Sequence, residues 1–385
     1  MAVTPNHVVF VTRDGTLGGD QLFLLYFLRW LTASTTVRAE VLTWHEGTLT
    51  DDLRDVTDVR SMDELDRWRP ARVFEVLRVQ RAAQVLKGAR LRWWLHRRRG
   101  ADVLYVNGLE AARIVGYLRN DHPRVVVHVH DLGDLEGGRL TDVDRDLVRE
   151  RTDTFVAASD EVADALRAWG VTPDRIRRHD HFVTGAGLLP ASTRKPDRVQ
   201  LGLAEDDLVV GGIGTADWWA AADQFVLLAW TLRRRRPDLP LRFLWIAGDD
   251  DERILWPLRH DLANAGVDDV TVVATGRRSL DHLDVLDVLA LSTRVESQEL
   301  IALEAAAADV PVVATDNLAR TGSIGELAHV VPYLDVDAMA AAVDDLLLPG
   351  PVREAQVERG REVTRRHHDV SVGGPALLDL LGSRR

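Results

Sequence analysis

Hydrophobic positions along the chain follow two alternating patterns. Short runs rich in branched apolar residues, such as HVVFV at 7–11 and RVVVHV at 124–129, indicate buried strands. Longer segments with apolar residues every three or four positions, such as DQLFLLYFLRWLTAS at 20–34, indicate helices. Strands joined through helices run parallel, by right-handed crossovers. The pattern therefore predicts an α/β fold built on parallel sheets.

One stretch interrupts this alternation. Residues 185–198, GAGLLPASTRKPDR, combine Gly, Pro, Ser and charge without periodicity, and the strand–helix pattern then restarts at LVVGGI. We therefore predict two Rossmann-like, doubly wound domains that face each other across a cleft, at 1–190 and 191–365. A C-terminal helical segment, 366–385, is a candidate to cross back to the N-terminal domain. Open α/β sheets bind ligands beyond the carboxyl ends of their strands, so the cleft is the expected site.

Composition narrows the function classes. The chain has 385 residues, 46% of them apolar, which favours folded cores throughout. It contains no cysteine, so disulfides, thiolate metal sites and a cysteine nucleophile are excluded, and a reducing compartment suits it. The first residues lack the pattern of a secretion signal, and no run of eighteen apolar residues occurs. We expect a cytoplasmic protein.

Charge argues against nucleic acid as a partner, because the net charge of −12 opposes attraction to phosphate backbones. One segment departs from this balance. RLRWWLHRRRG, at 90–100, gathers cations around two tryptophans. It suits either a membrane surface or anionic acceptor, or the end of a helix whose cations complement the C-terminal dipole. We favour the helix end, so membrane contact is not expected.

Two glutamates, Glu296 and Glu304, lie eight residues apart where a predicted strand ends and a helix begins. A carboxylate there can accept hydrogen bonds from vicinal sugar hydroxyls, while free amides at the helix start can meet phosphate. Nucleotide sugars carry both groups. The alternative is that Glu304 is only a good helix former and Glu296 a solvated loop acid.

The surrounding sequence resembles a known family. DVLALSTRVESQELIALEAAAADVPVVATD, from Asp287, is similar to the donor-binding segment of retaining family-4 glycosyltransferases of GT-B fold, with its strand, Ser-Arg-acidic loop, E-x7-E and Pro-Val-Val in the same order. The likeness continues in VHDL at 129–132, GIGTADWW at 212–219 and LWIAG at 244–248. It implies a retaining, hexosyltransferase-type enzyme that moves a sugar from a nucleotide diphosphate to a small natural product or a cell-surface glycan.

The resemblance also implies roles for residues. Glu304 is expected on the ribose hydroxyls, and Glu296 and His130 beside the transferred sugar as the catalytic pair. His130 has a plainer alternative, a satisfied histidine at a strand end, and Gly19 another, an ordinary tight turn. The expected donor-binding positions, with Glu304, are Gly18, Gly19, Gly214, Thr215, Ala220, Arg294, Gln298, Glu299 and Leu300.

The chain departs from the family at the diphosphate. Relatives carry a Lys-Gly pair where this chain has Ala220-Ala221. Three explanations are open. Another arginine (Arg253, Arg277 or Arg294) takes the place of the lysine, the protein is a catalytically impaired relative that acts in binding or as a scaffold, or the sequence was altered here. Gln298 and Glu299 also replace the usual Gly, Pro or aromatic residues, which points to an unusual donor sugar.

No metal or cofactor is expected beyond the nucleotide sugar as co-substrate. The acidic run GDDDE at 248–252 suits a solvated turn better than a divalent-metal site, since GT-B enzymes are usually metal-independent. GTLGGD, at 15–20, lacks the lysine of a P-loop and the third glycine of a dinucleotide fingerprint. A GT-B epimerase or phosphorylase explains the E-x7-E context less well, and neither Lys87 nor Lys195 lies where a phosphorylase anchors pyridoxal.

Overall fold

The computed structural model divides the chain into two compact units. The N-terminal unit comprises Met1–Asp180 and Val370–Arg385, and the C-terminal unit comprises His181–Asp369. The residues whose structure is described are 4–16, 18–63, 80–119, 121–136, 140–184, 198–247, 251–275, 280–294, 299–318 and 322–382. The domain boundary predicted at 190 falls between 184 and 198, outside these ranges. The chain therefore passes between units twice, after Asp180 and after Asp369.

The N-terminal unit is built on a parallel sheet. Its seven described strands lie in the order β3-β2-β1-β4-β5-β6-β7, and neighbours pair in parallel. The strands are β1 (His7–Asp14), β2 (Arg38–His45), β3 (Asp58–Ser61), β4 (Val103–Asn107), β5 (Arg124–Val129), β6 (Thr154–Ala157) and β7 (Ile176–Arg178).

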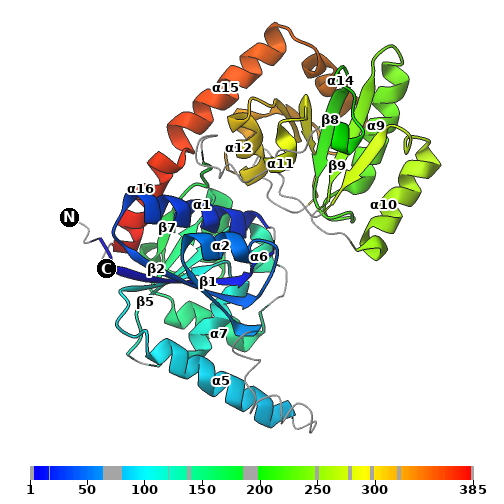
Figure 1. Ribbon diagram of the computed structural model, residues 1–385. Coiled ribbons are helices and arrows are strands. Elements are labelled where there is room, and N and C mark those ends of the chain that lie inside the picture. The colour runs from blue at the N-terminus through cyan, green and yellow to red at the C-terminus, as the bar shows by residue number, and fades with distance from the viewer. Residues whose placement is uncertain are drawn as a thin grey trace. The chain divides into compact units, whose positions relative to one another are not determined.

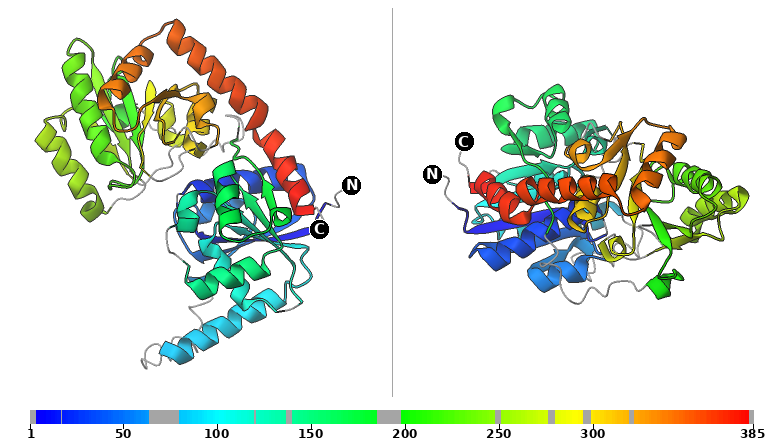
Figure 2. Two further views of the ribbon diagram at one scale, coloured as in Figure 1. Left: turned by 180° about the vertical axis from the view of Figure 1, so that it is seen from behind. Right: turned by 90° about the horizontal axis from the view of Figure 1, so that it is seen from above.

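Helices cover both faces of this sheet (Figures 1 and 2). One face carries α1 (Gly19–Ser34), α2 (Thr50–Val56) and α16 (Val370–Gly382). The other carries α5 (Gln80–His96), η1 (Glu110–Tyr117) and α7 (Asp142–Arg151). Shorter connections are α6 (Leu132–Glu136), α8 (Asp160–Ala168) and η2 (Pro173–Arg175).

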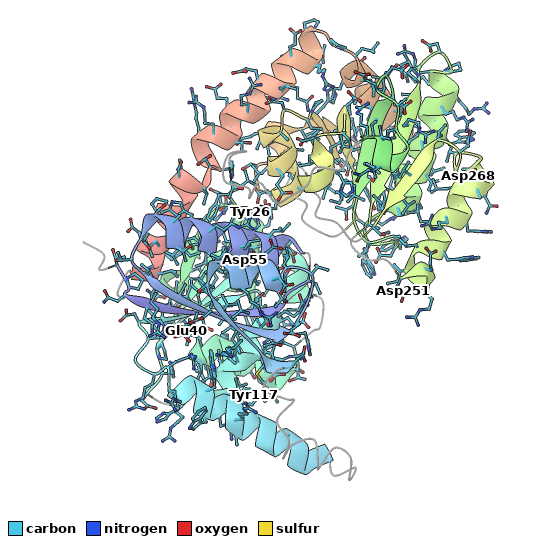
Figure 3. The ribbon with its side chains drawn as sticks, in the orientation of Figure 1. Tyr26, Glu40, Asp55, Tyr117, Asp251 and Asp268 are labelled. Atoms are coloured by element: carbon cyan, nitrogen blue, oxygen red, sulfur yellow. The ribbon has the colours of Figure 1, made fainter. Side chains whose placement is uncertain are left out.

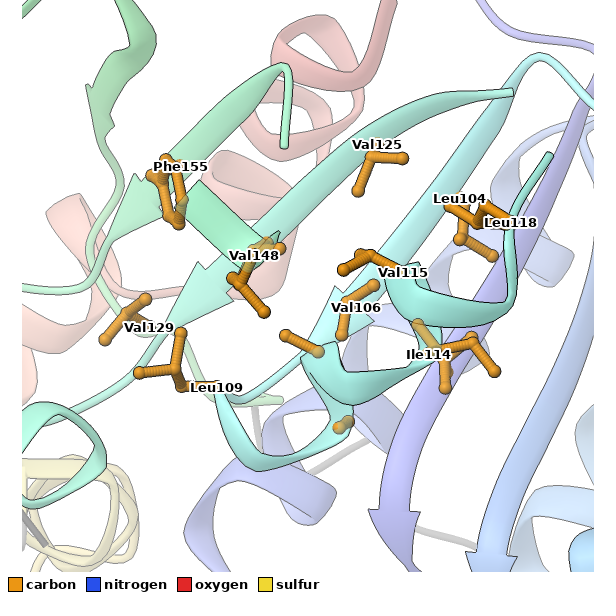
Figure 4. Close-up of a cluster of buried hydrophobic side chains, with 14 of the residues drawn as sticks. Leu104, Val106, Leu109, Ile114, Val115, Leu118, Val125, Val129, Val148 and Phe155 are labelled. Atoms are coloured by element: carbon orange, nitrogen blue, oxygen red, sulfur yellow. The ribbon is translucent and has the colours of Figure 1, made fainter. Parts of the chain in front are cut away.

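The core of this unit explains why its strands are apolar on both sides. Figure 4 shows valines of β4 and β5 packed against η1 and against Val148 of α7. On the other face, α1 is buried between the sheet and α16, so it is apolar nearly all round. Gly374 of α16 permits this packing, because a Cβ there would lie 2.6 Å from the Trp30 ring. The C-terminal helix is thus part of the N-terminal unit's core.

The C-terminal unit repeats the plan. Its six described strands lie in the order β10-β9-β8-β11-β12-β13 and pair in parallel. They are β8 (Leu208–Ile213), β9 (Leu241–Ile246), β10 (Thr271–Ala274), β11 (Val288–Leu291), β12 (Val312–Thr315) and β13 (His329–Val331). The helices are η3 (Arg198–Leu201), α9 (Ala222–Arg235), α10 (Glu252–Ala265), α11 (Leu280–Leu283), α12 (Glu299–Ala307), α13 (Ile324–Leu327), α14 (Val336–Leu347) and α15 (Pro351–His367).

Both sheets reverse their strand order beside the first strand. In the N-terminal unit the reversal falls between β1 and β4, and in the C-terminal unit between β8 and β11. Connections leave such a switch point on opposite faces, which opens a crevice at the carboxyl ends where ligands bind. Among the described helices, none has an apolar stretch long enough to cross a membrane.

Candidate active site

Helix α12 begins at the switch point of the C-terminal unit. β11 ends at Leu291 and α12 starts at Glu299, so the helix N-terminus lies beyond the carboxyl end of a strand. Glu299, Leu300 and Glu304 are all buried, and Glu304 is only 3% exposed. Glu296 and Gln298, both predicted at the donor, lie outside the described residues. The helix therefore presents two buried carboxylates at the edge where ligands are expected.

The loop between β8 and α9 lies at the same switch point. Gly214 has a φ of 144°, and its N–H donates to the Ile246 carbonyl at 3.1 Å. Ala220 and Ala221 are buried, and Ala221 has φ 57° and ψ 40°, which places the residue before α9 in the left-handed region. Side chains are disfavoured there and glycine is not. The backbone at this position is thus shaped for the glycine that relatives carry. Thr215 follows directly on Gly214 in this loop.

Arg294 holds this loop in place. Its guanidinium donates to both carboxylate oxygens of Asp223 at 2.7 Å and stacks over the Trp218 ring at 4.7 Å. It also donates to the Trp218 carbonyl at 2.6 Å, and 8% of its side-chain surface is exposed. Burial would raise the pKa of Asp223, but hydrogen bonds from Arg294 and Gln224 and the charge of Arg294 together lower that pKa. Arg294 is therefore already engaged inside the unit.

The other arginines weighed as substitutes differ from Arg294. Arg253 is exposed over 91% of its side chain and pairs with Asp251 at 2.5 Å, whereas Arg277 lies outside the described residues. Asp251 caps α10, since its carboxylate accepts the Arg253 N–H at 2.9 Å. Figure 3 labels Asp251 just before this helix and Asp268 just after it. Within the described ranges, no group of three or more His, Asp or Glu side chains is placed to hold a metal ion.

A pocket opens within this edge of the C-terminal unit. It is lined by Ser292, Thr315 and Tyr333, which follow or end strands β11, β12 and β13, and by side chains from α9 and the start of α14. These positions share the carboxyl edge of the sheet with α12. Glu299 and Glu304 are not among the residues that line this pocket.

The N-terminal unit has a polar cluster at its own switch point. His130 follows β5 and is 6% exposed; its Nε2 lies 2.9 Å from Asn107 Oδ1 at the end of β4. The Asn107 amide in turn donates to the Asp20 carbonyl in α1 at 2.8 Å. His130 also stacks on His128, with ring centroids 4.2 Å apart. The ends of two strands and the start of α1 are thus tied together around His130.

Gly18 and Gly19 open α1 beside this cluster. A Cβ at Gly18 would overlap the Gln21 side chain, whereas a Cβ at Gly19 would meet no described atom within 4 Å. Gly19 is the first residue of the helix, which other residue types also enter. Packing among the described residues therefore does not require glycine at 19.

Asn107 and Asp20 are site residues that the sequence did not single out. Burial raises the pKa of Asp20 to about 6; Arg13 opposes the shift, and Asp131 and Asp14 add to it. A carboxylate with a raised pKa in a crevice is a candidate functional group. The available signals were an asparagine ending the apolar run VLYVN and an acid directly after two glycines.

The fold and these two edges define a class: two Rossmann-like units of the GT-B type. Solved structures of this fold include HepE of Anabaena in complex with UDP-glucose, at 15% identity and a TM-score of 0.76, covering 98% of this chain and 100% of that one. They also include WaaG, a glycosyltransferase involved in lipopolysaccharide biosynthesis, at 14% identity and a TM-score of 0.68, covering 97% and 99%. The predicted GT-B fold class is confirmed.

Sequence families agree with the fold. Residues 18–183 match Glycosyltransferase Family 4, and residues 195–348 match Glycosyl transferases group 1. A D-inositol 3-phosphate glycosyltransferase of Saccharomonospora viridis is 29% identical over 64% of this chain and 59% of its own length; that of Nocardia farcinica is 28% identical over 60% and 56%. The chain thus spans less than two thirds of these relatives. Together the two family matches span most of both units.

Proposed function

We propose that the protein is a retaining, hexosyltransferase-type glycosyltransferase that moves a sugar from a nucleotide-diphosphate sugar to an acceptor hydroxyl. The observation that carries the proposal is the buried Glu304 carboxylate on a helix that starts at the switch point of the group 1 domain. A carboxylate at this edge can accept charge-assisted hydrogen bonds from vicinal ribose hydroxyls. The UDP-glucose complex of HepE, which shares the fold, supports a nucleotide sugar as donor.

In this proposal each unit has its own part. Glu304 binds the ribose, and the unpaired N–H groups of Glu299 and Leu300 in the first turn of α12 face the diphosphate. His130, with Glu296, lies at the transferred sugar. The leaving phosphate takes the proton of the attacking hydroxyl on the same face of the sugar, which retains the anomeric configuration. Amides placed before the reaction stabilise the charge that grows on the leaving phosphate.

The diphosphate is the weak point of the proposal. Ala220 has no charged group, and Arg294 is already bound to Asp223. Neither residue therefore offers a cation to the diphosphate in the described geometry. Backbone amides of α12 and of the loop before α9 are what remains there. The loss of a charged hydrogen bond is typically worth ~1.5–3 kcal/mol, so turnover about tenfold to a hundredfold slower than in lysine-bearing relatives is expected. The alternative function is nucleotide binding without turnover, and the alanine at 220 in place of a lysine favours it.

We propose no metal and no further cofactor. The diphosphate charge is met by helix amides in this scheme, so a divalent ion has no required part. Turnover with 5 mM EDTA should equal turnover with Mg²⁺; a loss of activity in EDTA that Mg²⁺ restores would reject the metal-independent mechanism.

For the acceptor we propose an uncharged hydroxyl compound, either a small natural product or a glycan. Asp14, Asp20 and Asp131 gather near the start of α1, and Arg13 is bonded to Asp14 at 2.7 Å and to Glu110 at 3.3 Å. An anionic acceptor would be repelled by this edge, where like charges cost up to several kcal/mol. With a working donor, myo-inositol should therefore be a better acceptor than inositol 3-phosphate. The reverse preference would reject this assignment.

The deciding experiment is donor binding. Isothermal titration with UDP and UDP-glucose should show binding to the wild-type protein, weakened about tenfold or more in Glu304→Gln, because two charged hydrogen bonds are lost. Glu40→Gln is a matched control, since Glu40 is also a buried carboxylate, 5% exposed, but lies on β2 of the N-terminal unit (Figure 3). Equal weakening in both variants would assign the effect to stability, and unchanged affinity in Glu304→Gln would reject the ribose role.

A further inference from the structure

Glu299 takes part in a buried polar network that the proposed function does not use. Its carboxylate lies 2.7 Å from Nδ1 of His181 and accepts the Ser323 N–H at 2.6 Å. His368 completes the network, with Nε2 2.6 Å from the Ser323 hydroxyl and Nδ1 2.6 Å from the His181 carbonyl. Glu299 and His368 are 2% exposed, and His181 is 6% exposed. The network therefore lies almost wholly out of water.

The hydrogen-bond pattern fixes one proton of this network. A carbonyl can only accept, so Nδ1 of His368 carries the hydrogen that faces the His181 carbonyl. Nε2 of His368 can then accept the Ser323 hydroxyl while the ring is neutral. His368 therefore needs no charge to make these two hydrogen bonds, and any charge that it carries adds to that of His181 at Glu299. The imidazole placed to compensate the Glu299 carboxylate is that of His181.

The backbone at Gly322 leaves room for the Glu299 carboxylate. Gly322 has a φ of 56°, and a Cβ there would overlap the Glu299 carboxylate. Only glycine leaves room for the Ser323 N–H to reach the oxygen. The carboxylate also lies where the chain enters and leaves the C-terminal unit, because His181 is the first residue of that unit and His368 the last but one. The approach of Glu299 is therefore a built feature of the fold.

Glu299 is also the first residue of α12. A negative charge at a helix start suits the helix dipole, but it competes with any second anion at the same place. Burial would raise the pKa of Glu299, yet the His181 hydrogen bond and charge, the Ser323 N–H and the charge of His368 together lower it. The carboxylate therefore stays ionised at neutral pH. Unless a cation offsets it, it opposes a diphosphate at the α12 start.

We propose that Glu299 and His181 act as one positioning pair, in which a protonated His181 imidazole cancels the Glu299 charge and lets a diphosphate bind at the start of α12. The inference rests on the proposed function, because it takes a nucleotide diphosphate as the ligand of α12. Protonation gives the imidazole a positive charge, so the pair makes donor affinity depend on pH. Among the described residues, the groups that face the Glu299 carboxylate are His181, His368 and the Ser323 N–H.

The sign of the pH dependence follows from charge. When the imidazole is protonated, the pair is neutral and donor binding is strongest. When the imidazole is neutral, one uncompensated negative charge remains and the affinity falls. One linked proton changes affinity by at most tenfold per pH unit, so the dissociation constant of UDP-glucose should rise with pH, by no more than about a hundredfold from pH 6 to pH 8.

Isothermal titration with UDP-glucose at pH 6, 7 and 8 tests the pair. UDP-glucose is the probe because its diphosphate has no proton that titrates in this range. Glu299→Gln should bind with nearly the same affinity at all three pH values, and His181→Gln should bind weakly at all three. Ser323→Ala is the matched control: it removes the hydroxyl bonded to His368 but keeps the N–H bonded to Glu299, so the wild-type pH dependence should persist.

The outcomes separate this inference from the proposed function. If the wild-type protein binds neither UDP-glucose nor UDP at any pH, the proposed donor is wrong and the pair falls with it. If the wild-type protein binds and Glu299→Gln keeps the same pH dependence, the pair alone is rejected. Thermal unfolding of the unliganded variants measures how much the pair contributes to stability. If the pair were purely structural, its loss would lower the melting temperature and leave the pH dependence of binding unchanged.

Discussion

The two units share a topology but treat charge at their switch points in opposite ways. In the C-terminal unit the buried Glu299 faces His181 at 2.7 Å and the partly exposed Asp223 faces Arg294 at 2.7 Å, so these two carboxylates have a cationic or ionisable partner. In the N-terminal unit Asp20 lies near Asp14 and Asp131, and its pKa is raised to about 6. The same strand order thus carries two different sets of charged side chains. In the proposed function, the C-terminal edge binds the diphosphate and the acidic N-terminal edge binds an uncharged acceptor.

Gly322→Ala should have the largest effect and shows how far the C-terminal edge depends on its buried carboxylate. The added Cβ overlaps the Glu299 carboxylate at a positive φ, so the loss of unfolding free energy should be about 3 kcal/mol or more. Gly202→Ala is the control, because Gly202 has a φ of 68° and its Cβ would meet nothing within 4 Å. It should cost only about 1 kcal/mol. Equal losses in urea unfolding would contradict a special role for Gly322.

His130→Ala tests the opposite edge. If His130 reaches the transferred sugar, turnover should fall about tenfold to a hundredfold while UDP affinity stays within about twofold of the wild-type value. Steady-state kinetics with the identified acceptor, together with UDP titration, separate the two effects. Asn107→Ala should follow in the same direction, because Asn107 holds the His130 ring at 2.9 Å. Unchanged turnover in both variants would leave His130 as a satisfied core histidine.

Asp20→Asn should change the unfolding free energy of the acidic N-terminal unit in a way that depends on pH. The folded-state pKa of about 6 lies above the ordinary value of 3.8, so folding favours the protonated form and ionisation destabilises the unit. The penalty appears as the pH rises from about 4 to 6 and is complete above 6. Asparagine resembles the protonated acid, so this variant should gain about 1–2 kcal/mol of unfolding free energy at pH 7.5 and almost none at pH 4. An equal gain at both pH values would contradict the assigned cause.

Ala221→Gly should give the smallest effect. Glycine relieves the left-handed backbone at the start of α9, at φ 57°, and should raise the unfolding free energy by about 1 kcal/mol. Ala222→Gly, one residue into the helix, should lower it by up to about 1 kcal/mol. Differential scanning calorimetry compares the two. A loss of stability in Ala221→Gly would mean that the alanine is not strained.

In the N-terminal unit the sequence predicted the centre of the sheet better than its edges. Valine-rich β1 and β5 were predicted because central parallel strands are buried on both faces. No prediction covered β3 and β7, whose sequences DVRS and IRR are short and mostly polar. Short, polar edge strands of this kind leave too weak a pattern for periodicity to detect.

Some parts of the candidate site were likewise predictable from the sequence and others were not. The start of α12 and the position of His130 at a strand end follow from local pattern and appear in the structure. The Glu299–His181 contact joins residues 118 positions apart, and Arg294 pairs with Asp223 71 positions away. Such pairings depend on how the strands are ordered in the sheet, which local sequence does not encode. They are also what shows that Arg294 is already engaged by Asp223.

The most direct test of the account is a crystal structure with UDP-glucose bound. The account predicts that the ribose hydroxyls lie within hydrogen-bond distance of the Glu304 carboxylate and that the diphosphate lies at the first turn of α12. A nucleotide bound only to residues before 180, or with its ribose away from Glu304, would contradict it.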